Sequence, residues 1–240
     1  MRQSGWNSAV VRGIAIVCLL ALAVLGVGSR VALADDAQDA QQLVEKSLLT
    51  FQAFIADKEM GPPLQSLLKK ARGVLIYPQV LEGAFIFGVS GGSGTFLARD
   101  EKHAWGGPAF YTIGQVSFGL MAGGQASEVV LVALTDRGVA ALLATSAKLG
   151  ADVAIAAGPV GAGAQAATAN LSGDIISYAR NKGLYAGISV NGAVVATRGG
   201  LNAAYYGKEV TPTQILIQRE VSNPKAAPLI EAVSKEVAEK

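Results

Sequence analysis

The sequence predicts a single α+β domain, in which a mainly antiparallel β-sheet of sandwich-like or barrel-like form is flanked by N-terminal, middle and C-terminal helices. The first observation is the stretch 105–136, where apolar or small residues alternate over 116–122 and an apolar run fills 129–134, as expected of strands. The second is that apolar residues recur at helical spacing near both ends of the chain. We expect residues 105–136 to form a hairpin at the centre of the sheet, turning at Gly123-Gly124.

The segments before the central stretch supply two helices and the first strands. Apolar residues recur at helical spacing from Ala37 to Ala56, which predicts an amphipathic first helix. Met60-Gly61-Pro62-Pro63 interrupts that pattern, and a proline in the first turn suits a second short helix from Leu64 to Lys70. The strands expected next lie at 74–77, 84–89 and 95–98, the last two joined by a Gly-Gly-Ser-Gly turn at 91–94.

The segments after the central stretch contain both kinds of element. Residues 135–149 predict a helix that is capped by Thr135-Asp136 and ends at Gly150. Residues 201–208 are predicted to be irregular, Thr211-Pro212 opens a short helix, and Asn223-Pro224 opens a final amphipathic helix. Further strands are expected within 152–170 and at 174–178, 184–190 and 193–197, with turns at 180–183 and at Asn191-Gly192.

The first 34 residues have the pattern of a secretory signal peptide. Residues 1–12 contain Arg2 and Arg12 and no acidic residue, and residues 13–28 form an apolar run. Ala32-Leu33-Ala34 then has the small-x-small pattern of a cleavage site. We predict cleavage after Ala34, a mature domain over 35–240 and a periplasmic or secreted location. An uncleaved membrane anchor is the alternative, although the apolar run is short compared with the roughly 20 residues that span a bilayer.

Cleavage also changes the charge and the thiol content of the chain. The whole sequence has 20 basic and 18 acidic residues. Residues 1–34 hold three of the basic residues and no acidic one, which leaves 17 against 18 and a net charge of −1. Such a domain lacks the broad positive field of a nucleic-acid-binding protein, so no nucleic acid partner is expected. The only cysteine, Cys18, leaves with the signal peptide, so a packed core must stabilise the mature chain.

One short motif raises the question of a serine hydrolase. Gly88-Val89-Ser90-Gly91-Gly92 fits G-x-S-x-G, and Asp100 and His103 follow it. A nucleophile elbow requires strand, sharp turn and helix, whereas Ser90 is followed by a glycine turn and another strand. His103 is the only histidine in the chain, and we expect it to lie at the surface. A glycine hairpin turn is the simpler interpretation.

A second short motif raises the question of a nucleotide site. The segment from Gly161 to Ala166 fits G-x-G-x-x-A, but Pro159 interrupts its entry and no parallel βαβ pattern surrounds it. No acidic residue lies at the expected offset of about 20 residues. With one histidine and no cysteine in the mature chain, a zinc site is not expected. We therefore expect neither a cofactor nor a metal, and no catalysis.

Five longer stretches of the sequence form a recognisable series: 71–78 (ARGVLIYP), 107–111 (GPAFY), 149–161 (LGADVAIAAGPVG), 178–187 (YARNKGLYAG) and 205–208 (YYGK). They resemble the SYLF-domain family. The motifs agree in order, and the resemblance covers roughly residues 43–218, most of the mature chain. The family is a lipid-binding domain of secreted bacterial proteins and of eukaryotic proteins that carry Src-homology or FYVE modules; eukaryotic members bind phosphoinositides, and some bind actin.

The resemblance implies a non-catalytic protein of the bacterial cell envelope that binds an anionic phospholipid or a membrane surface. The candidate lipid-binding residues are Lys69, Lys70 and Arg72, with Arg180 and Lys182 as a second group. A solvated helix end is the plainer interpretation of the first group, and the stripe of the first helix fits either the core or a membrane. The alternatives are an envelope structural or protein-interaction module, and an enzyme that uses the Gly161–Ala166 loop or Ser90.

Overall fold

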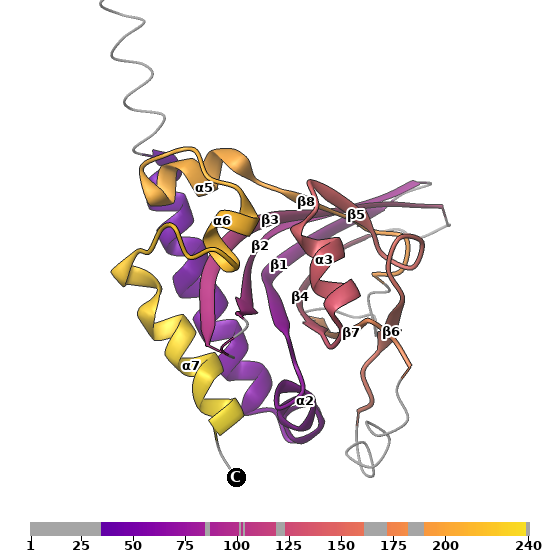
Figure 1. The fold of residues 1–240 in the computed structure, drawn as a ribbon. Helices are drawn as coiled ribbons and strands as arrows, with labels where there is room; N and C mark the ends of the chain where they lie inside the picture. The colour runs from indigo at the N-terminus through magenta and orange to yellow at the C-terminus, as the bar shows by residue number, and fades with distance from the viewer. Residues whose placement is uncertain are drawn as a thin grey trace, which may run out of the picture.

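The computed structural model describes residues 35–84, 87–100, 102, 104–118, 123–160, 172–181 and 190–238. Its strands are β1 Gly73–Ala84, β2 Phe87–Arg99, β3 Trp105–Phe118, β4 Gly123–Ala133, β5 Ser146–Lys148, β6 Ile155–Ala157, β7 Ile175–Asn181 and β8 Val194–Thr197. They form one sheet in the order β5-β8-β3-β2-β1-β4-β7-β6 (Figure 1). All pairs are antiparallel except β6 with β7. The predicted α+β class is therefore confirmed.

Helices cover both faces of this sheet (Figure 1). One face carries the N-terminal helix, which is our name for the helical residues 35–55, together with α2 Gly61–Leu68, α5 Gly199–Tyr206 and α7 Ala227–Ala238. The other face carries α3 Asp136–Leu143 and α6 Pro212–Leu216. Each face has its own hydrophobic core, so the inner part of the sheet is sealed on both sides.

The strand β1 shows how one sequence serves two cores. Val74 and Ile76 face the core under the N-terminal helix, while Leu75 and Tyr77 face the other core, and all four are fully buried. A strand buried on both faces reads as a continuous apolar run instead of an alternation. Each such side chain contributes about 1.5–3 kcal/mol relative to its exposed state.

The N-terminal helix faces the core, which settles the choice that its sequence left open. Its buried stripe consists of Ala40, Val44, Ser47, Phe51 and Phe54, at spacings of three and four residues. Phe51 and Phe54 are 1% and 0% exposed, so neither ring is free to enter a membrane. The described part of the chain contains no helix that is both long enough and apolar enough to cross a bilayer.

The predicted central hairpin is wrong. β3 and β4 are separated in the sheet by β2 and β1, which are the true centre. Gly123-Gly124 lies within β4 and not at a turn. The alternation and the apolar run correctly marked two strands, but local sequence does not say which strands pair.

Two other predictions fail for related reasons. Residues 91–94 were expected to be a turn, yet they lie in the middle of the continuous strand β2. Residues 201–208 were expected to be irregular, yet α5 covers most of them, because Leu201 and Tyr205 are buried in the core and Gly207 ends the helix at φ 72°. Tertiary packing overrides a weak local signal in both cases.

The helix starts were predicted more successfully. The Thr135 hydroxyl accepts a hydrogen bond from the Gly138 N–H at the start of α3. Thr211 and Gln214 form a capping box at α6, with Pro212 in its first turn. α7 follows a short 3-10 turn at Pro224–Ala226, as the Asn223-Pro224 signal indicated. The expected strand 184–190 falls mostly outside the described residues.

Candidate functional site

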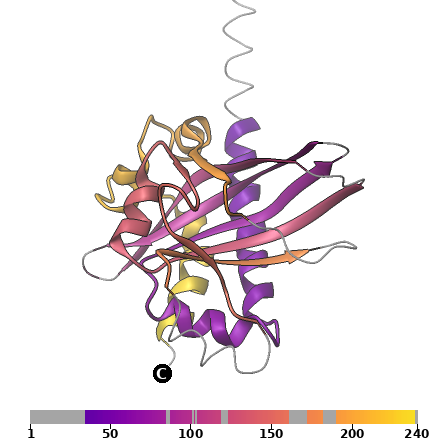
Figure 2. The same cartoon turned by 90° about the vertical axis from the view of Figure 1, so that its right-hand side faces the viewer.

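The outer parts of the long strands carry exposed apolar side chains. Leu81, Val89 and Val116 are 56%, 59% and 65% exposed, and Val194 in β8 is 43% exposed. Figure 2 shows the long strands continuing well past the indigo N-terminal helix. Single exposed apolar residues are ordinary in proteins, so the question is whether these side chains adjoin one another.

Strand register places them on one face of the sheet. β2 alternates outward from Leu97, which lies in the core under the N-terminal helix, so Ser93, Gly91 and Val89 share that face. Residues paired across antiparallel strands also share a face. Two neighbouring rows result, which together we call the apolar platform: Ala126, Leu81, Gly91, Gly114 and Val194, then Gly124, Gly83, Val89 and Val116.

The glycines of the platform are not required by the fold. A Cβ on Gly83 would meet no atom within 4 Å, and a Cβ on Gly91 or Gly114 would come no closer than 3.7 Å or 3.9 Å to a backbone oxygen. Gly94, on the buried side, differs because its Cβ would lie 2.5 Å from the Ile76 oxygen. Glycine inside a strand that packing does not explain indicates close approach by a ligand or another backbone. The platform is thus an uncharged sheet surface with room for an apolar partner.

Two cations border the inner edge of the platform. Lys46 projects from the N-terminal helix and helps to line a cavity of about 280 Å³, beside Leu49, which is 65% exposed. Arg198, at the end of β8, reaches across β3 and donates a hydrogen bond to Ser93 Oγ at 2.7 Å. Among the described residues neither cation has an acidic partner. The platform is therefore an uncharged surface with two cations along its inner edge.

The first predicted basic group lies elsewhere. Lys69 and Lys70 are exposed just after α2, and Arg72 forms an ion pair with Asp136. They precede the start of β1, whereas Leu81 lies near its outer end, so at about 3.3 Å per residue some 26 Å separate Gly73 from the platform. The two surfaces cannot act as one contact, and the role of these three residues stays a prediction.

Arg180 is held inside the structure. Its guanidinium donates to Glu128 Oε2, with Nε at 2.8 Å, and to the Ala53 carbonyl oxygen at 3.4 Å. It also lies 5.2 Å from the centre of the Phe54 ring. These contacts fasten the N-terminal helix to β4 and β7, so Arg180 is not grouped with Lys69 and Lys70. Lys182 lies outside the described residues.

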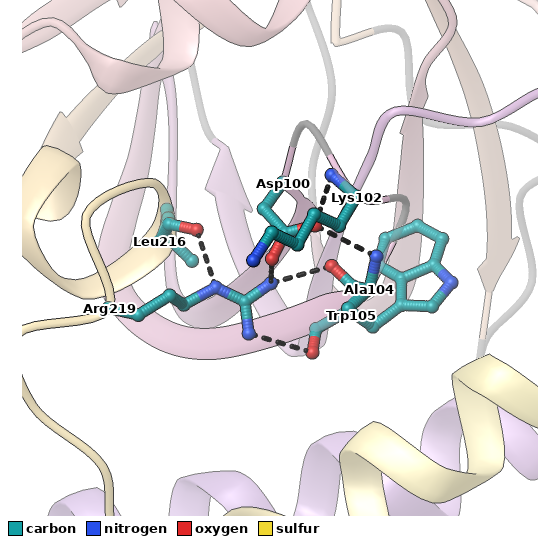
Figure 3. Close-up of polar contacts among 6 residues, drawn as sticks. All are labelled: Asp100, Lys102, Ala104, Trp105, Leu216 and Arg219. Carbon is teal, nitrogen blue, oxygen red and sulfur yellow. Dashed lines mark hydrogen bonds and ion pairs between the residues drawn. The ribbon is translucent and has the colours of Figure 1, made fainter.

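A second polar cluster, at the opposite end of β2, has a structural role (Figure 3). Arg219 donates to the carbonyl oxygens of Ala104, Trp105 and Leu216, and its Nη2 lies 3.3 Å from Asp100 Oδ2. Burial works to raise the pKa of Asp100, but the Ala104 N–H and the Arg219 charge outweigh it and lower the pKa. The Arg219 contacts tie Asp100, after the end of β2, and the backbone of Ala104 and Trp105, at the start of β3, to the segment after α6.

The two catalytic alternatives gain no support. Ser90 lies within β2, paired with Gln115, and not on a strand–turn–helix elbow. His103 and the Gly161–Ala166 loop lie outside the described residues. The described residues contain no group of three or more His, Cys, Asp or Glu side chains that could hold a metal ion.

Comparison with known proteins identifies the family. The sequence pattern described as "Ysc84: Las17-binding protein actin regulator" matches residues 114–236. The chain belongs to the Ysc84 (SYLF-domain) family. This confirms the family resemblance found in the sequence, and the names of its members describe binding or regulatory proteins.

Curated relatives of this Ysc84-family chain come from yeast and animals. Protein YSC84 of Saccharomyces cerevisiae is 32% identical over 183 residues, which are 75% of this chain and 38% of that protein. LAS seventeen-binding protein 3 of the same species is 31% identical over 74% of this chain and 39% of its own length. The human SH3 domain-containing YSC84-like protein 1 is 28% identical over 62% and 44%. The chain thus spans less than half the length of these relatives.

The sequence did not reveal the platform or its border. Gly91, Gly92 and Gly94 were interpreted as a turn, which concealed that some of these glycines point to an open face. Neither Lys46 nor Arg198 is among the residues that the sequence marks as candidates. The sequence did contain one usable signal: a glycine and a valine two residues apart within a predicted strand, as at Gly114 and Val116. Residues at that spacing share one face of a strand.

Proposed function

We propose that this Ysc84-family domain is a non-catalytic binding protein that attaches to phospholipid surfaces through the apolar platform. The observation that carries the proposal is the platform itself, which is exposed, uncharged and continuous over five strands. Partly exposed valine and leucine side chains would leave water on entering the acyl region. Lys46 and Arg198 would then lie at the level of the phosphates, where each base contributes about 1 kcal/mol on an anionic membrane.

Co-sedimentation with phosphatidylglycerol–phosphatidylcholine vesicles tests this proposal. The variant Val89→Ser/Val116→Ser should bind roughly 30-fold more weakly, because two partly exposed side chains each lose about 1 kcal/mol of transfer free energy. Val160→Ser is the matched control, since Val160 is 54% exposed but lies outside the platform. A folded wild-type protein that binds no vesicle, or a double variant that binds as the wild type does, would refute the proposal.

The same assay decides between the platform and the predicted basic group. If the platform meets the membrane, Lys69, Lys70 and Arg72 lie well beyond the Debye length of about 8–10 Å, so changing all three to glutamine should leave binding nearly unchanged. Changing Lys46 and Arg198 to glutamine should instead weaken binding by about 2 kcal/mol on anionic vesicles, and added salt should act in the same direction. The reverse pattern would move the contact surface to the start of β1.

A protein partner is the second candidate function. It is favoured by the names of the relatives, one of which is a LAS seventeen-binding protein. The platform also suits a protein surface, because an apolar sheet face can pack against another sheet. Vesicle binding that fails in every lipid composition, while the platform variants abolish capture of one purified partner, would favour this candidate.

Export of the protein is part of the proposal. It is supported by the charge and apolar pattern of residues 1–34, which lie outside the described residues. Intact-mass measurement of the protein recovered from the producing cell tests it. A chain that starts at Asp35 would agree with export, whereas a mass that includes residues 1–34 would favour the anchored alternative.

A further inference from the structure

We propose that the cavity beside the N-terminal helix binds the phosphodiester headgroup of one anionic glycerophospholipid, whose acyl chains lie along the apolar platform. This inference rests on the proposed function and adds a saturable site to it. The cavity and the platform adjoin, because Ala126 belongs to both and pairs with Leu81.

The cavity exists because β1 bulges. The register of β1 shifts against both β2 and β4 between Ile76 and Val80, so the strand carries extra backbone at the same place on both sides. Pro78 stands within this bulge and has no N–H to offer a ladder. The N-terminal helix then spans the bulge and leaves a space of about 280 Å³ below it. Its lining residues are Lys46, Leu49, Thr50, Pro78, Gln79, Ala126, Ser127 and Glu128.

The charge of the cavity favours an anion. Glu128 is the one acidic lining residue, and the Arg180 guanidinium binds its carboxylate. Ser127 Oγ donates to Asn181 Oδ1 at 2.7 Å and is thereby occupied. Lys46 remains as a cation for which the described residues provide no acid. The Thr50 hydroxyl and the Gln79 amide add hydrogen-bond donors of the kind that phosphate oxygens accept.

The size and the exit of the cavity favour a headgroup with an apolar tail. Pockets that enclose a whole drug-sized ligand measure roughly 300–1,000 Å³, so 280 Å³ suits a headgroup and not its acyl chains. Two exposed apolar side chains adjoin the cavity: the lining residue Leu49 is 65% exposed on the helix, and Leu81, which pairs with the lining residue Ala126, is 56% exposed on β1. An amphiphile can therefore place its charge beside Lys46 and its chains on the strands.

Titration calorimetry with dihexanoyl phosphatidylglycerol, kept below its micelle concentration, tests the site on the purified protein. We expect saturable binding of one lipid per chain. Lys46→Gln should weaken it about fivefold, the effect of one base near an anionic group. Ala126→Leu should abolish it by filling the cavity, while Lys58→Gln, an exposed lysine outside the lining, should have no effect. A thermal melt of each variant verifies that it is folded.

The outcomes separate this inference from the proposed function. Wild-type protein that binds vesicles through the platform but shows no saturable binding of the short-chain lipid overturns the inference alone. Failure of both overturns both. Glycerol 3-phosphate that binds as tightly as the short-chain lipid also overturns it, because the tail would then contribute nothing. If Ala126→Leu does not fold, unchanged affinity in Lys46→Gln is sufficient to reject the site.

Discussion

Replacing Arg180 with methionine should destabilise the domain and leave the vesicle affinity of the folded protein unchanged. The side chain of Glu128 is 7% exposed, and it would keep its charge after losing the guanidinium. Removing one partner of a buried ion pair costs about 3–5 kcal/mol. Because the Arg180 side chain is 29% exposed and Glu128 has a further polar or electrostatic contact besides Arg180, we expect the lower end, about 3 kcal/mol. For a chain of this size that corresponds to a fall of roughly 6–12 °C in Tm.

Urea unfolding followed by circular dichroism measures this loss. Arg137→Met is the matched control, because Arg137 is 70% exposed, lies 3.8 Å from Asp174 and should cost less than about 1 kcal/mol. Arg180→Met/Glu128→Leu should recover most of the stability, since no charge then stays buried. A loss below about 1 kcal/mol in the single variant would refute this account. So would a folded Arg180→Met protein that no longer binds vesicles, because Arg180 would then contact lipid.

Three further predictions concern stability. Gly94→Ala should lower the free energy of unfolding by about 2 kcal/mol or more, because the new Cβ would lie 2.5 Å from a backbone oxygen. Gly91→Ala should change it by no more than about 0.5 kcal/mol in the same urea titration. Equal losses in the two variants would contradict the distinction between the two glycines. The pKa of Asp174 is lowered, chiefly because its carboxylate accepts a hydrogen bond from Thr135. The Ala154 N–H and the Arg137 charge also lower this pKa, and together these contacts outweigh the effect of partial burial, which raises it. The contribution of the Asp174 carboxylate to the free energy of unfolding is therefore present above its unfolded pKa of about 3.9, and it is lost as pH falls through the lower folded pKa. Asp174→Asn should then make the free energy of unfolding depend less on pH below about 4. An unchanged pH dependence in this variant would reject the prediction. Arg219→Lys should lower the free energy of unfolding by about 2 kcal/mol, because an ammonium cannot reproduce the guanidinium fork that donates to the carbonyl oxygens of Ala104 and Trp105. Arg219 has φ 57°, a backbone conformation that suits glycine. If Arg219→Gly is more stable than the wild type in a thermal melt, backbone strain outweighs these contacts and the prediction is wrong.

The fold class and most helices could be predicted because their signals are local. The Thr211 cap, the proline in α2 and the stripe on α7 each lie within a few residues of sequence. Strand pairing could not be predicted, since the pairs β1–β4 and β3–β8 join segments far apart in the chain. α5 escaped notice because its two leading glycines disfavour a helix, and only the burial of Leu201 and Tyr205 offsets this.

The candidate site was harder to predict than the fold, for a physical reason. The family resemblance directed attention to clustered basic residues, and Arg180 is among them. Arg180 does not face solvent freely, because its guanidinium binds Glu128, which lies 52 residues away in the sequence. The platform is exposed because none of the described helices covers that part of the sheet face, which local sequence does not reveal. Gly91 and Gly94 are three residues apart in one strand, and only the fold tells that one faces open space and the other faces the Tyr77 ring.

The long strands are held by different contacts along their length, and this bears on how such a domain can evolve. Substitutions in the inner part of β1, at Val74 to Tyr77, disturb two cores at once and should be strongly selected against. Substitutions at Val89 or Val116 alter a surface that the fold does not need, so their cost to stability is small. Binding preference can therefore drift on the outer strands while the scaffold stays intact. If the platform is the binding surface, a few changes in this one small area are enough to give the domain a new partner.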